Sequence, residues 1–438
     1  MTTTPLANSA VTHSAGPLAG LALTTLLASL AVSSANIALP TLAAQLHVGF
    51  ADVQWVTLAY LLATTTLVVG AGRLGDVLGR RRVLLGGLAL FAAASGGAAL
   101  APGLGWLVAA RVLQGVGAAA MLALTMVFVG TALPKARAGS AMGLLGTMSA
   151  VGTALGPSLG GGLIAAHGWP AIFAVNLPLG MLAFAMVWRW LPADTAPRGH
   201  PSLDLPGMAW LALTLSAFAI AVTRQPAMLL VAAAGLAGLV RAERRAASPL
   251  IRLDRLRERG IGAGLAMNAL VSAVMMGTLV IGPFHLGGTL GLGAAAVGGL
   301  MSIGPAVSAL SGVPAGRLAD HLGTRRATLL GLGAMLAGCV LIAVLPVSLG
   351  AIGYVGPLVL VTPGYALFQA ANNAAVMADG AAEQRGVVAG LLTLSRNLGL
   401  ITGASALAAA YGWAGLLPGF AMAVAMLAVA LGLARRAQ

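Results

Sequence analysis

Charged residues are scarce in this chain. They make up 8% of its 438 positions, whereas hydrophobic residues make up 59%. A soluble domain has about 25% charged residues and could not hide so much apolar surface. Apolar runs of roughly 20 residues, the length that crosses a bilayer as a helix, recur from end to end. The composition therefore excludes a soluble protein and predicts an all-α polytopic membrane protein.

Cysteine is nearly absent too. Cys339 is the single one, which rules out an intramolecular disulfide and a cysteine-based metal site. The sequence also lacks a phosphate-binding loop of the Gly-x-x-x-x-Gly-Lys type, a paired-histidine metal motif and a nucleophile elbow. We therefore expect no enzyme activity, no cofactor and no metal. Any transport would be driven by a gradient, of an ion or of the substrate itself, and not by ATP.

Acidic residues are scarcer than basic residues. Ten of them stand against 24 basic residues, for a net charge of +14. The basic residues cluster in alternate loops between the apolar segments, with Arg224 as the exception. By the positive-inside rule these loops are cytoplasmic, which predicts a cytoplasmic (inner) membrane protein with both termini inside. We expect this charge to meet membrane lipid and not nucleic acid.

Fourteen apolar segments can be counted. They cover about 17–39, 52–71, 83–101, 106–131, 139–165, 171–190, 206–223, 226–240, 261–283, 293–315, 326–346, 350–371, 386–410 and 414–434. The segment at 226–240 is short for a bilayer, although loop charges on both sides favour a crossing. Three regions follow: a six-helix bundle at 1–191, a linker at 192–259 and a second six-helix bundle at 260–438. The linker is predicted to hold two extra transmembrane helices and a solvated basic cytoplasmic segment from Arg241 to Arg259.

The chain contains an internal repeat. The stretch Gly72-Arg-Leu-Gly-Asp-Val-Leu-Gly-Arg-Arg-Arg82 recurs 244 positions later as Gly316-Arg-Leu-Ala-Asp-His-Leu-Gly-Thr-Arg-Arg326. The segment Gly139-Ser-Ala-Met-Gly-Leu-Leu145 resembles Gly386-Val-Val-Ala-Gly-Leu-Leu392 at an offset of 247. Two similar offsets predict a duplicated bundle in parallel orientation, related by a pseudo-two-fold axis.

We call the two repeated stretches the hinges, because each joins two predicted helices. Their candidate latch residues are Gly72, Arg73, Asp76, Gly79, Arg80 and Arg81 in the first copy and Gly316, Arg317, Asp320 and Arg325 in the second. Glycines let helix ends approach closely, and Asp76 can accept hydrogen bonds from a neighbouring helix N-terminus. Such a latch would break when the bundles rock. The alternative is a solvated charged loop that only sets topology.

Two further motifs accompany the hinges. One is Arg111-Val-Leu-Gln114-Gly-Val-Gly-Ala-Ala119, and the other is Gly152-Thr-Ala-Leu-Gly156-Pro157-Ser-Leu-Gly160. Together with the hinge, they resemble the major facilitator superfamily, and within it the drug:proton antiporters with fourteen spanning segments. The resemblance implies that Arg111 and Gln114 belong to a coupling site and that Gly152, Gly156, Pro157 and Gly160 form an exporter signature. The alternatives are an arginine that snorkels to the membrane interface and a face for helix packing alone.

One departure from the resemblance concerns the first helix. Ala31 stands where relatives usually have aspartate, and no acidic residue falls in the middle of a predicted span. Protons remain the candidate coupling ion, and His285 is the histidine that lies close to a span. Without a buried carboxylate a cationic cargo would not be neutralised, so neutral, zwitterionic or anionic amphiphiles are favoured.

Polar residues inside the predicted spans are the candidates for substrate contact. We single out Asn36, Gln54, Tyr60, Asn268, Gln369, Asn372, Asn373 and Arg396. For each one, a hydrogen bond between helices is an equally good explanation. The group of Asn372, Asn373 and Arg396 is the densest in the second half and is the preferred binding site.

The sequence thus predicts a monomeric secondary-active exporter of hydrophobic or amphipathic small molecules, which works by alternating access. Two alternatives stay open. One is a facilitator or uptake transporter without proton antiport. The other is a non-transporting membrane sensor on the same fold.

Overall fold

The computed structural model describes the chain except residues 1–8, 133–134, 195–203, 246–258, 379–384 and 438. Every regular element in the described part is helical. This follows from the apolar sequence, since a helix pairs all its backbone polar groups within one segment and needs no water to do so. Four of the ten acidic residues, Asp254, Glu258, Asp379 and Glu383, lie outside the described part.

The first half of the chain forms helices up to the connector after residue 190. They are α1 (Ser9–Gln45), α2 (Phe50–Val53), α3 (Trp55–Leu78), α4 (Arg80–Ala99), α5 (Leu104–Ala132), α6 (Lys135–His167), α7 (Pro170–Ala174) and α8 (Asn176–Trp190). The connector is followed by α9 (Leu205–Thr223) and α10 (Met228–Arg245).

The second half repeats the arrangement. Its elements are α12 (Arg259–Phe284), the π-helical turn η1 (His285–Thr289), α13 (Ala294–Leu322), α14 (Thr324–Val344), the 3-10 turn η2 (Val347–Leu349), α15 (Gly350–Ala378), α16 (Arg385–Thr402), the π-helical turn η4 (Gly403–Leu407), α17 (Ala408–Ala414) and α18 (Leu416–Ala437). Each predicted apolar segment therefore coincides with a helix or with a run of short helices.

Membrane spans can be counted among these helices by length and composition. Within the described ranges, ten helices are long and apolar enough to cross a bilayer. The count reaches eleven if Phe50–Val68 and Gly70–Leu78, bent by 53° from each other, form one span. The multi-pass membrane architecture is confirmed, while the number fourteen stays a prediction.

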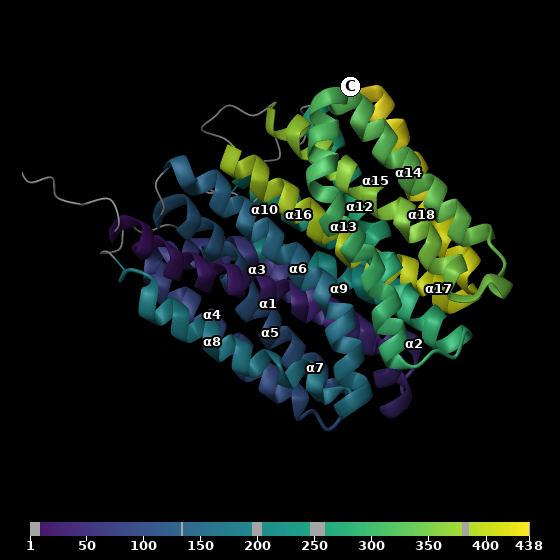
Figure 1. The fold of residues 1–438 in the computed structure, drawn as a ribbon, viewed down its shortest axis with the longest axis horizontal. Helices are drawn as coiled ribbons and strands as arrows, with labels where there is room; N and C mark the ends of the chain where they lie inside the picture. The colour runs from purple at the N-terminus through teal and green to yellow at the C-terminus, as the bar shows by residue number, and fades with distance from the viewer. Residues whose placement is uncertain (1–8, 133–134, 195–203, 246–258, 379–384, 438) are drawn as a thin grey trace, which may run out of the picture.

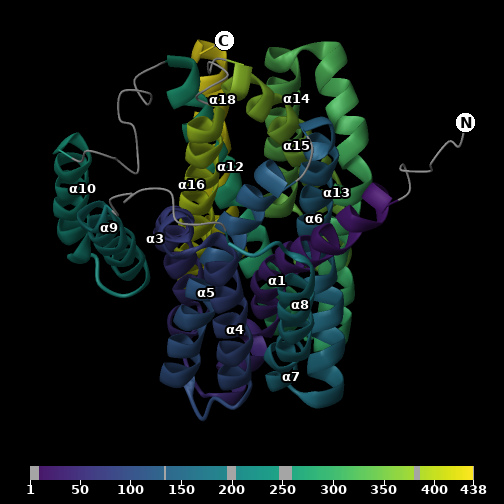
Figure 2. The ribbon, with the colours of Figure 1, turned by 90° about the vertical axis from the view of Figure 1, so that its left-hand side faces the viewer.

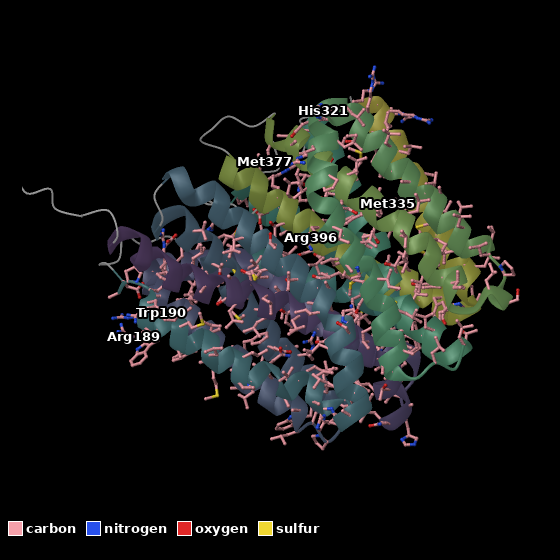
Figure 3. All side chains as sticks on the ribbon, in the orientation of Figure 1. Arg189, Trp190, His321, Met335, Met377 and Arg396 are labelled. Carbon is pink, nitrogen blue, oxygen red and sulfur yellow. The ribbon has the colours of Figure 1, made fainter. Side chains whose placement is uncertain are left out.

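The helices form two bundles. In Figure 1 the purple and blue helices α1 to α8 make one bundle, and the green and yellow helices α12 to α18 make the other. Neighbours within each bundle pack along their lengths, as α1 does with α6 and α14 does with α15. Met335 is fully buried inside the second bundle, while Arg189 and Trp190 lie at the exposed end of α8 (Figure 3).

Helices α9 and α10 form a pair beside the two bundles. Figure 2 shows them apart from the rest, on the side of α3 and α16, and α9 contacts both α3 and η4. The basic segment that was predicted to start at Arg241 begins inside helix α10, with Arg241, Arg244 and Arg245 exposed. Helix α10 continues to Arg245 and buries Glu243, which is 4% exposed, because that side chain faces Gly207 of α9.

The two hinges share one backbone feature. Gly79 separates α3 from α4 with a φ of 103°, and Gly323 separates α13 from α14 with a φ of 77°. Both values lie in the region that glycine adopts without a steric penalty. The two glycines are 244 positions apart in sequence. The sequence repeat is thus a repeat of backbone conformation. We call the ends of the helices at these glycines the hinge end, and the opposite ends the far end.

Candidate transport site

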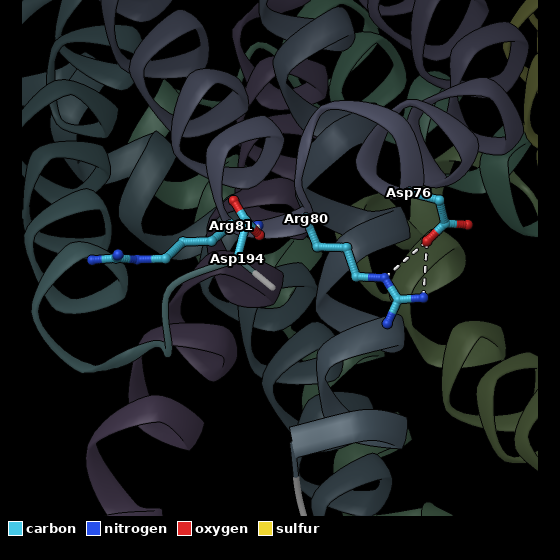
Figure 4. A network of polar contacts seen from close by, with 4 residues as sticks. All are labelled: Asp76, Arg80, Arg81 and Asp194. Carbon is cyan, nitrogen blue, oxygen red and sulfur yellow. Dashed lines mark hydrogen bonds and ion pairs between the residues drawn. The ribbon is translucent and has the colours of Figure 1, made fainter. Parts of the chain in front are cut away.

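The first hinge contains a short ion pair. Arg80 donates from its Nε to Asp76 Oδ1 at 2.9 Å, and its Nη2 lies 2.8 Å from the same oxygen (Figure 4). Both side chains are more than a third exposed, so solvent screens the pair. The sequence predicted that Asp76 would accept hydrogen bonds from the N-terminus of a neighbouring helix. Among the described residues, its partner in this conformation is Arg80, another of the candidate latch residues.

A second carboxylate occupies the helix N-terminus beside this ion pair. Asp194, which follows α8, accepts from the backbone N–H of Arg81 at 2.7 Å and from that of Arg82 at 3.1 Å. The Arg81 guanidinium donates to the carbonyl of Trp188 (Figure 4 shows Asp194 next to Arg81). A Cβ on Gly79 would overlap with the Asp194 carboxylate. Asp194 therefore caps α4 from another segment and ties the connector to the hinge.

The second hinge differs from the first. Arg317, Asp320 and Arg325 are exposed, and Asp320 forms no ion pair with any residue in the described ranges. No carboxylate of the described chain accepts from the first amides of α14, in contrast to α4. The sequence repeat thus carries one capped and one uncapped hinge.

Arg111 is the largest fully buried side chain among the described residues. Its Nε donates to the carbonyl of Val56 at 2.8 Å, and its Nη1 donates to Gln114 Oε1 at 2.6 Å. The guanidinium lies over the ring of Tyr60, 4.4 Å from the ring centroid. Gln114 in turn donates to Ser95 Oγ at 2.7 Å. These contacts join α3, α4 and α5, so the alternative of an arginine that snorkels to the interface is excluded.

Tyr60 serves this network and not an open cavity. It is 2% exposed, and its hydroxyl donates to the carbonyl of Ala28 at 3.0 Å. Its ring stacks under Arg111 while its hydroxyl anchors α1. In this conformation the predicted substrate residue Tyr60 is a packing partner of the buried arginine.

His285 opens the π-helical turn at the far end of α12. It is 5% exposed, and its ring lies 5.6 Å from the ring of Tyr354. Tyr354 donates to the carbonyl of Thr278 at 2.8 Å and lies edge-on to Phe420. The predicted coupling histidine is therefore packed in an aromatic cluster of the second bundle, far along the chain from Arg111 in the first.

The glycine face of α6 packs against α1. A Cβ on Gly156 would overlap with the side chain of Ser33, and one on Gly152 would overlap with the carbonyl of Leu26. Ser33 itself donates to the carbonyl of Gly152 at 3.1 Å. Close approach of two helix backbones requires small residues at the contact, which these glycines supply. Gly160 continues the face and meets Ser34 at ordinary contact distance.

The bundles meet at the far end. Phe50 lies 4.4 Å from Phe284 and 5.8 Å from Tyr411, measured between ring centroids. Gly161 of α6 and Gly298 of α13 pack so closely that a Cβ on either would overlap with the other's backbone. Because α13 starts at Ala294 and reaches its hinge only after Leu322, these contacts lie opposite the hinges.

Asn36 also lies between the bundles. It accepts from Thr57 Oγ1 at 2.8 Å, and its Nδ2 lies 4.0 Å from the sulfur of Met276 on α12. All three side chains are buried. The predicted substrate residue Asn36 therefore occupies a contact between α1 and α12 in this conformation.

The structure separates the polar group that was preferred for binding. Asn372 is buried and donates to the carbonyl of Gly264 at 3.1 Å, whereas Asn373 and Arg396 are exposed. Figure 3 shows Arg396 on α16 in the region where the two bundles face each other, and α16 contacts α3. Asn372 is thus a contact between helices, and Arg396 is the cation exposed to the interface between the bundles.

The remaining amide candidates differ in their hydrogen bonds. Asn268 joins α12 to α16 by donating to the carbonyl of Leu392 at 3.0 Å, and half-buried Gln369 donates within α15 to Tyr365 at 2.8 Å. Gln54 is buried, and neither polar atom of its side chain has a hydrogen-bond partner. Sequence reasoning treated these amides alike, whereas the structure shows that Asn268 and Gln369 each use the amide nitrogen and Gln54 uses neither polar atom.

Sequence reasoning missed Asp194. It read this residue as part of a polar connector, because nothing in the local sequence links it to Arg81, which lies 113 positions earlier. Two weaker signals could have suggested this contact. The arginine-rich start of the third predicted helix has no capping residue of its own, and an aspartate follows another span on the same side of the membrane.

The fold alone is that of a membrane transporter, built of two parallel helical bundles that meet at one end. The model of the Major Facilitator Superfamily matches residues 21–404. The chain belongs to this superfamily.

Named relatives agree with this assignment. The chain is 30% identical over 359 residues to the uncharacterized transporter YebQ of Escherichia coli (strain K12), covering 80% of this chain and 79% of the relative. It is 30% identical over 356 residues to the multidrug resistance protein Stp of Mycobacterium tuberculosis, covering 79% and 66%. A solved peptide transporter in complex with alafosfalin has a TM-score of 0.71 at 17% identity, with 96% of this chain and 94% of the other covered, and shares the fold.

Proposed function

We propose that this protein is a secondary-active exporter that moves hydrophobic or amphipathic small molecules out of the cytoplasm by alternating access. The observation that carries the proposal is the glycine face of α6, whose Gly152 and Gly156 pack against α1. This is the segment that resembles an exporter signature. Its similarity to a protein named as the multidrug resistance protein Stp supports a role in resistance to small molecules, which export would provide.

The hinges support a rocking mechanism. With the hinge end toward the cytoplasm, the aromatic contact of Phe50 with Phe284 and Tyr411 closes the outer side. In this conformation Asp76 pairs with Arg80 of its own hinge. Rocking would open the aromatic contact. It would also let Asp76 accept hydrogen bonds from a helix N-terminus of the opposing bundle, as the latch hypothesis requires.

The cargo follows from the charges along the path. Arg396 is exposed on α16 at the interface between the bundles, and the sequence places Ala31 where a carboxylate would neutralise a cation. Neutral, zwitterionic or acidic amphiphiles therefore suit this path better than cationic ones. Proton coupling would have to use a group other than a carboxylate at position 31, and Arg111 with Gln114 or His285 are the candidates.

Two experiments test this function. Purified protein in proteoliposomes with an imposed pH gradient should transport amphiphiles from a panel of charged and neutral compounds, and acidic or neutral members should be favoured. In energised cells, a protonophore should reduce efflux. Efflux that is unchanged by the protonophore would support the rival function of transport without proton antiport. Binding without flux would support a sensor.

A further inference from the structure

A pocket of about 750 Å³ lies at the far end, where the two bundles and the α9/α10 pair meet. Gln54 and Phe50 contribute to it from the first bundle, and Arg224 from the turn after α9. Apolar residues supply the rest of its wall, among them Val222, Ala409 and Met422. None of the pocket's lining residues belongs to the hinges or to the buried network around Arg111.

Three buried polar atoms, on the lining residue Gln54 and on its neighbour Trp55, have no hydrogen-bond partner in the described structure. They are the side-chain nitrogen and oxygen of Gln54, which is 1% exposed, and the indole nitrogen of Trp55. Buried polar atoms in folded proteins are nearly always paired, because an unpaired one loses its hydrogen bonds to water without compensation. The two donors among these atoms, Gln54 Nε2 and Trp55 Nε1, can therefore bind an acceptor that the described protein does not supply.

Arg224 stands next to these atoms. It forms an ion pair with Asp52 at 2.6 Å, and its guanidinium lies 5.7 Å from the centroid of the Trp55 ring. It is the basic residue that breaks the alternation of charged loops along the sequence. A guanidinium has five N–H donors, so one carboxylate does not exhaust it. Arg224, the Gln54 amide and the Trp55 indole together make a side rich in donors.

We propose that this pocket binds an amphiphile with an anionic, acceptor-rich head group, a phosphate or a carboxylate. Arg224, Gln54 and Trp55 hold the head group, and the apolar wall of α9, α17 and α18 holds an alkyl chain. Two sources share this chemistry: a phospholipid of the membrane and a free acidic amphiphile. Because both bundles line the pocket, its occupant bridges parts that separate when the far end opens. The site does not depend on the direction of transport proposed above.

Photolabelling tests the site. The probe is dodecanoic acid with a diazirine at its tail, added to the purified full-length protein in detergent, with the adducts mapped by peptide mass spectrometry. We expect adducts within 221–226 and 406–413 or on Met422. The variants Arg224→Gln and Gln54→Leu should each lower the yield by about tenfold, the loss that follows from removing a charge-assisted or buried hydrogen bond.

Matched controls keep the test decisive. Gln225→Leu removes an exposed amide one residue from Arg224 and should leave the yield unchanged. Trp55→Phe keeps an aromatic ring but removes the indole N–H, so it replaces Gln54→Leu if that variant fails to fold. Dodecanol with the same diazirine lacks the anionic head and should label weakly. Equal labelling by dodecanol, or equal yields in wild type, Arg224→Gln and the position-54 or position-55 variant, would overturn the proposal.

A second arm identifies the source. The same labelling is repeated in nanodiscs that contain phosphatidylglycerol. Loss of the dodecanoic acid adducts there supports the site with phospholipid as its occupant. Adducts that persist support the site with a free acidic amphiphile as its occupant. Adducts spread evenly over all lipid-facing helices in both settings contradict it.

Discussion

At the scale of single residues, Arg111 is a buried cation whose partners are all neutral. The Val56 carbonyl, the Gln114 side chain and the Tyr60 ring surround it, and its Nη2 has no hydrogen-bond partner. Burying a lone guanidinium costs several kcal/mol of desolvation free energy. Good hydrogen bonds recover about the same amount. Because burial of Arg111 brings no net gain in stability, we infer that this residue has a role in function.

Replacing Arg111 with methionine separates the two roles. The variant loses charge-assisted hydrogen bonds worth about 1.5–3 kcal/mol each but no longer buries a charge, so the net change in stability should stay below about 3 kcal/mol. We expect near-normal thermal stability in detergent and loss of flux in proteoliposomes. Arg189→Gln, on the exposed end of α8, is the control and should keep both. Normal flux in Arg111→Met would remove Arg111 from the coupling mechanism.

The two carboxylates at the first hinge should respond differently to substitution. Asp76 belongs to an exposed ion pair worth about 0–1 kcal/mol, so Asp76→Asn should insert and melt normally but impair transport. Asp194 caps a helix, so Asp194→Ala should cost about 0.5–2 kcal/mol and lower the melting temperature. Thermal melts and flux assays on both variants check this. Wild-type flux in Asp76→Asn would contradict the latch hypothesis.

Single residues were also where prediction from the sequence was least complete. Arg111 and Gln114 could be named together because one short motif, which resembles that of the family, contains both, and they are in contact. Asp194 could not be paired with Arg81, because their contact spans 113 positions and depends on how α8 lies beside α4. A motif identifies residues that are close in sequence but not a contact between distant segments.

At the scale of helices, the packing of α6 on α1 depends on glycine. A methyl group on Gly156 would overlap with Ser33, whereas one on Gly162 would point into open space. We therefore expect Gly156→Ala to reduce efflux from cells and Gly162→Ala, the matched control on the same helix, to leave it unchanged. Both variants should be expressed at the membrane in similar amounts.

A compensating change sharpens this test. Ser33→Gly removes the side chain that the new methyl group would strike, so the double variant Ser33→Gly with Gly156→Ala should recover part of the lost efflux. Lack of recovery, with both single variants well folded, would show that Gly156 matters for a reason other than contact with Ser33.

The helices themselves were largely predictable. The long apolar runs of the sequence predicted where the helices lie. The repeated glycine motif predicted the turns at Gly79 and Gly323. The end of α10 was not predictable in the same way, because its last turn carries charge. Only contact with α9 explains why Glu243 is buried there, and such a contact is absent from local composition.

At the scale of the whole molecule, the contact of α6 with α13 holds the far end closed. Gly161 and Gly298 lie with their backbones in contact, and each belongs to a different bundle. Cysteines in place of Phe50 and Phe284, whose rings meet between the same two bundles with centroids 4.4 Å apart, should cross-link under oxidation in a Cys339→Ala background. The cross-linked protein should lose flux in proteoliposomes, and a reducing agent should restore it.

The control for this cross-link is the pair of single cysteine variants, which should respond neither to oxidant nor to reductant. Rapid flux through fully cross-linked protein would mean that the far end need not open. The sequence repeat predicted two bundles but not the state in which they meet, because the same sequence must allow more than one state.

The unequal capping of the two hinges has a kinetic consequence. The first amides of α4 are held by Asp194, while those of α14 find no carboxylate among the described residues. Opening of a helix end exposes its amides to exchange with solvent. Hydrogen exchange should therefore be slower at Arg81 and Arg82 than at Arg325 and Arg326, and Asp194→Ala should erase the difference. Although its sequence is duplicated, the molecule would then unfold locally from one hinge before the other.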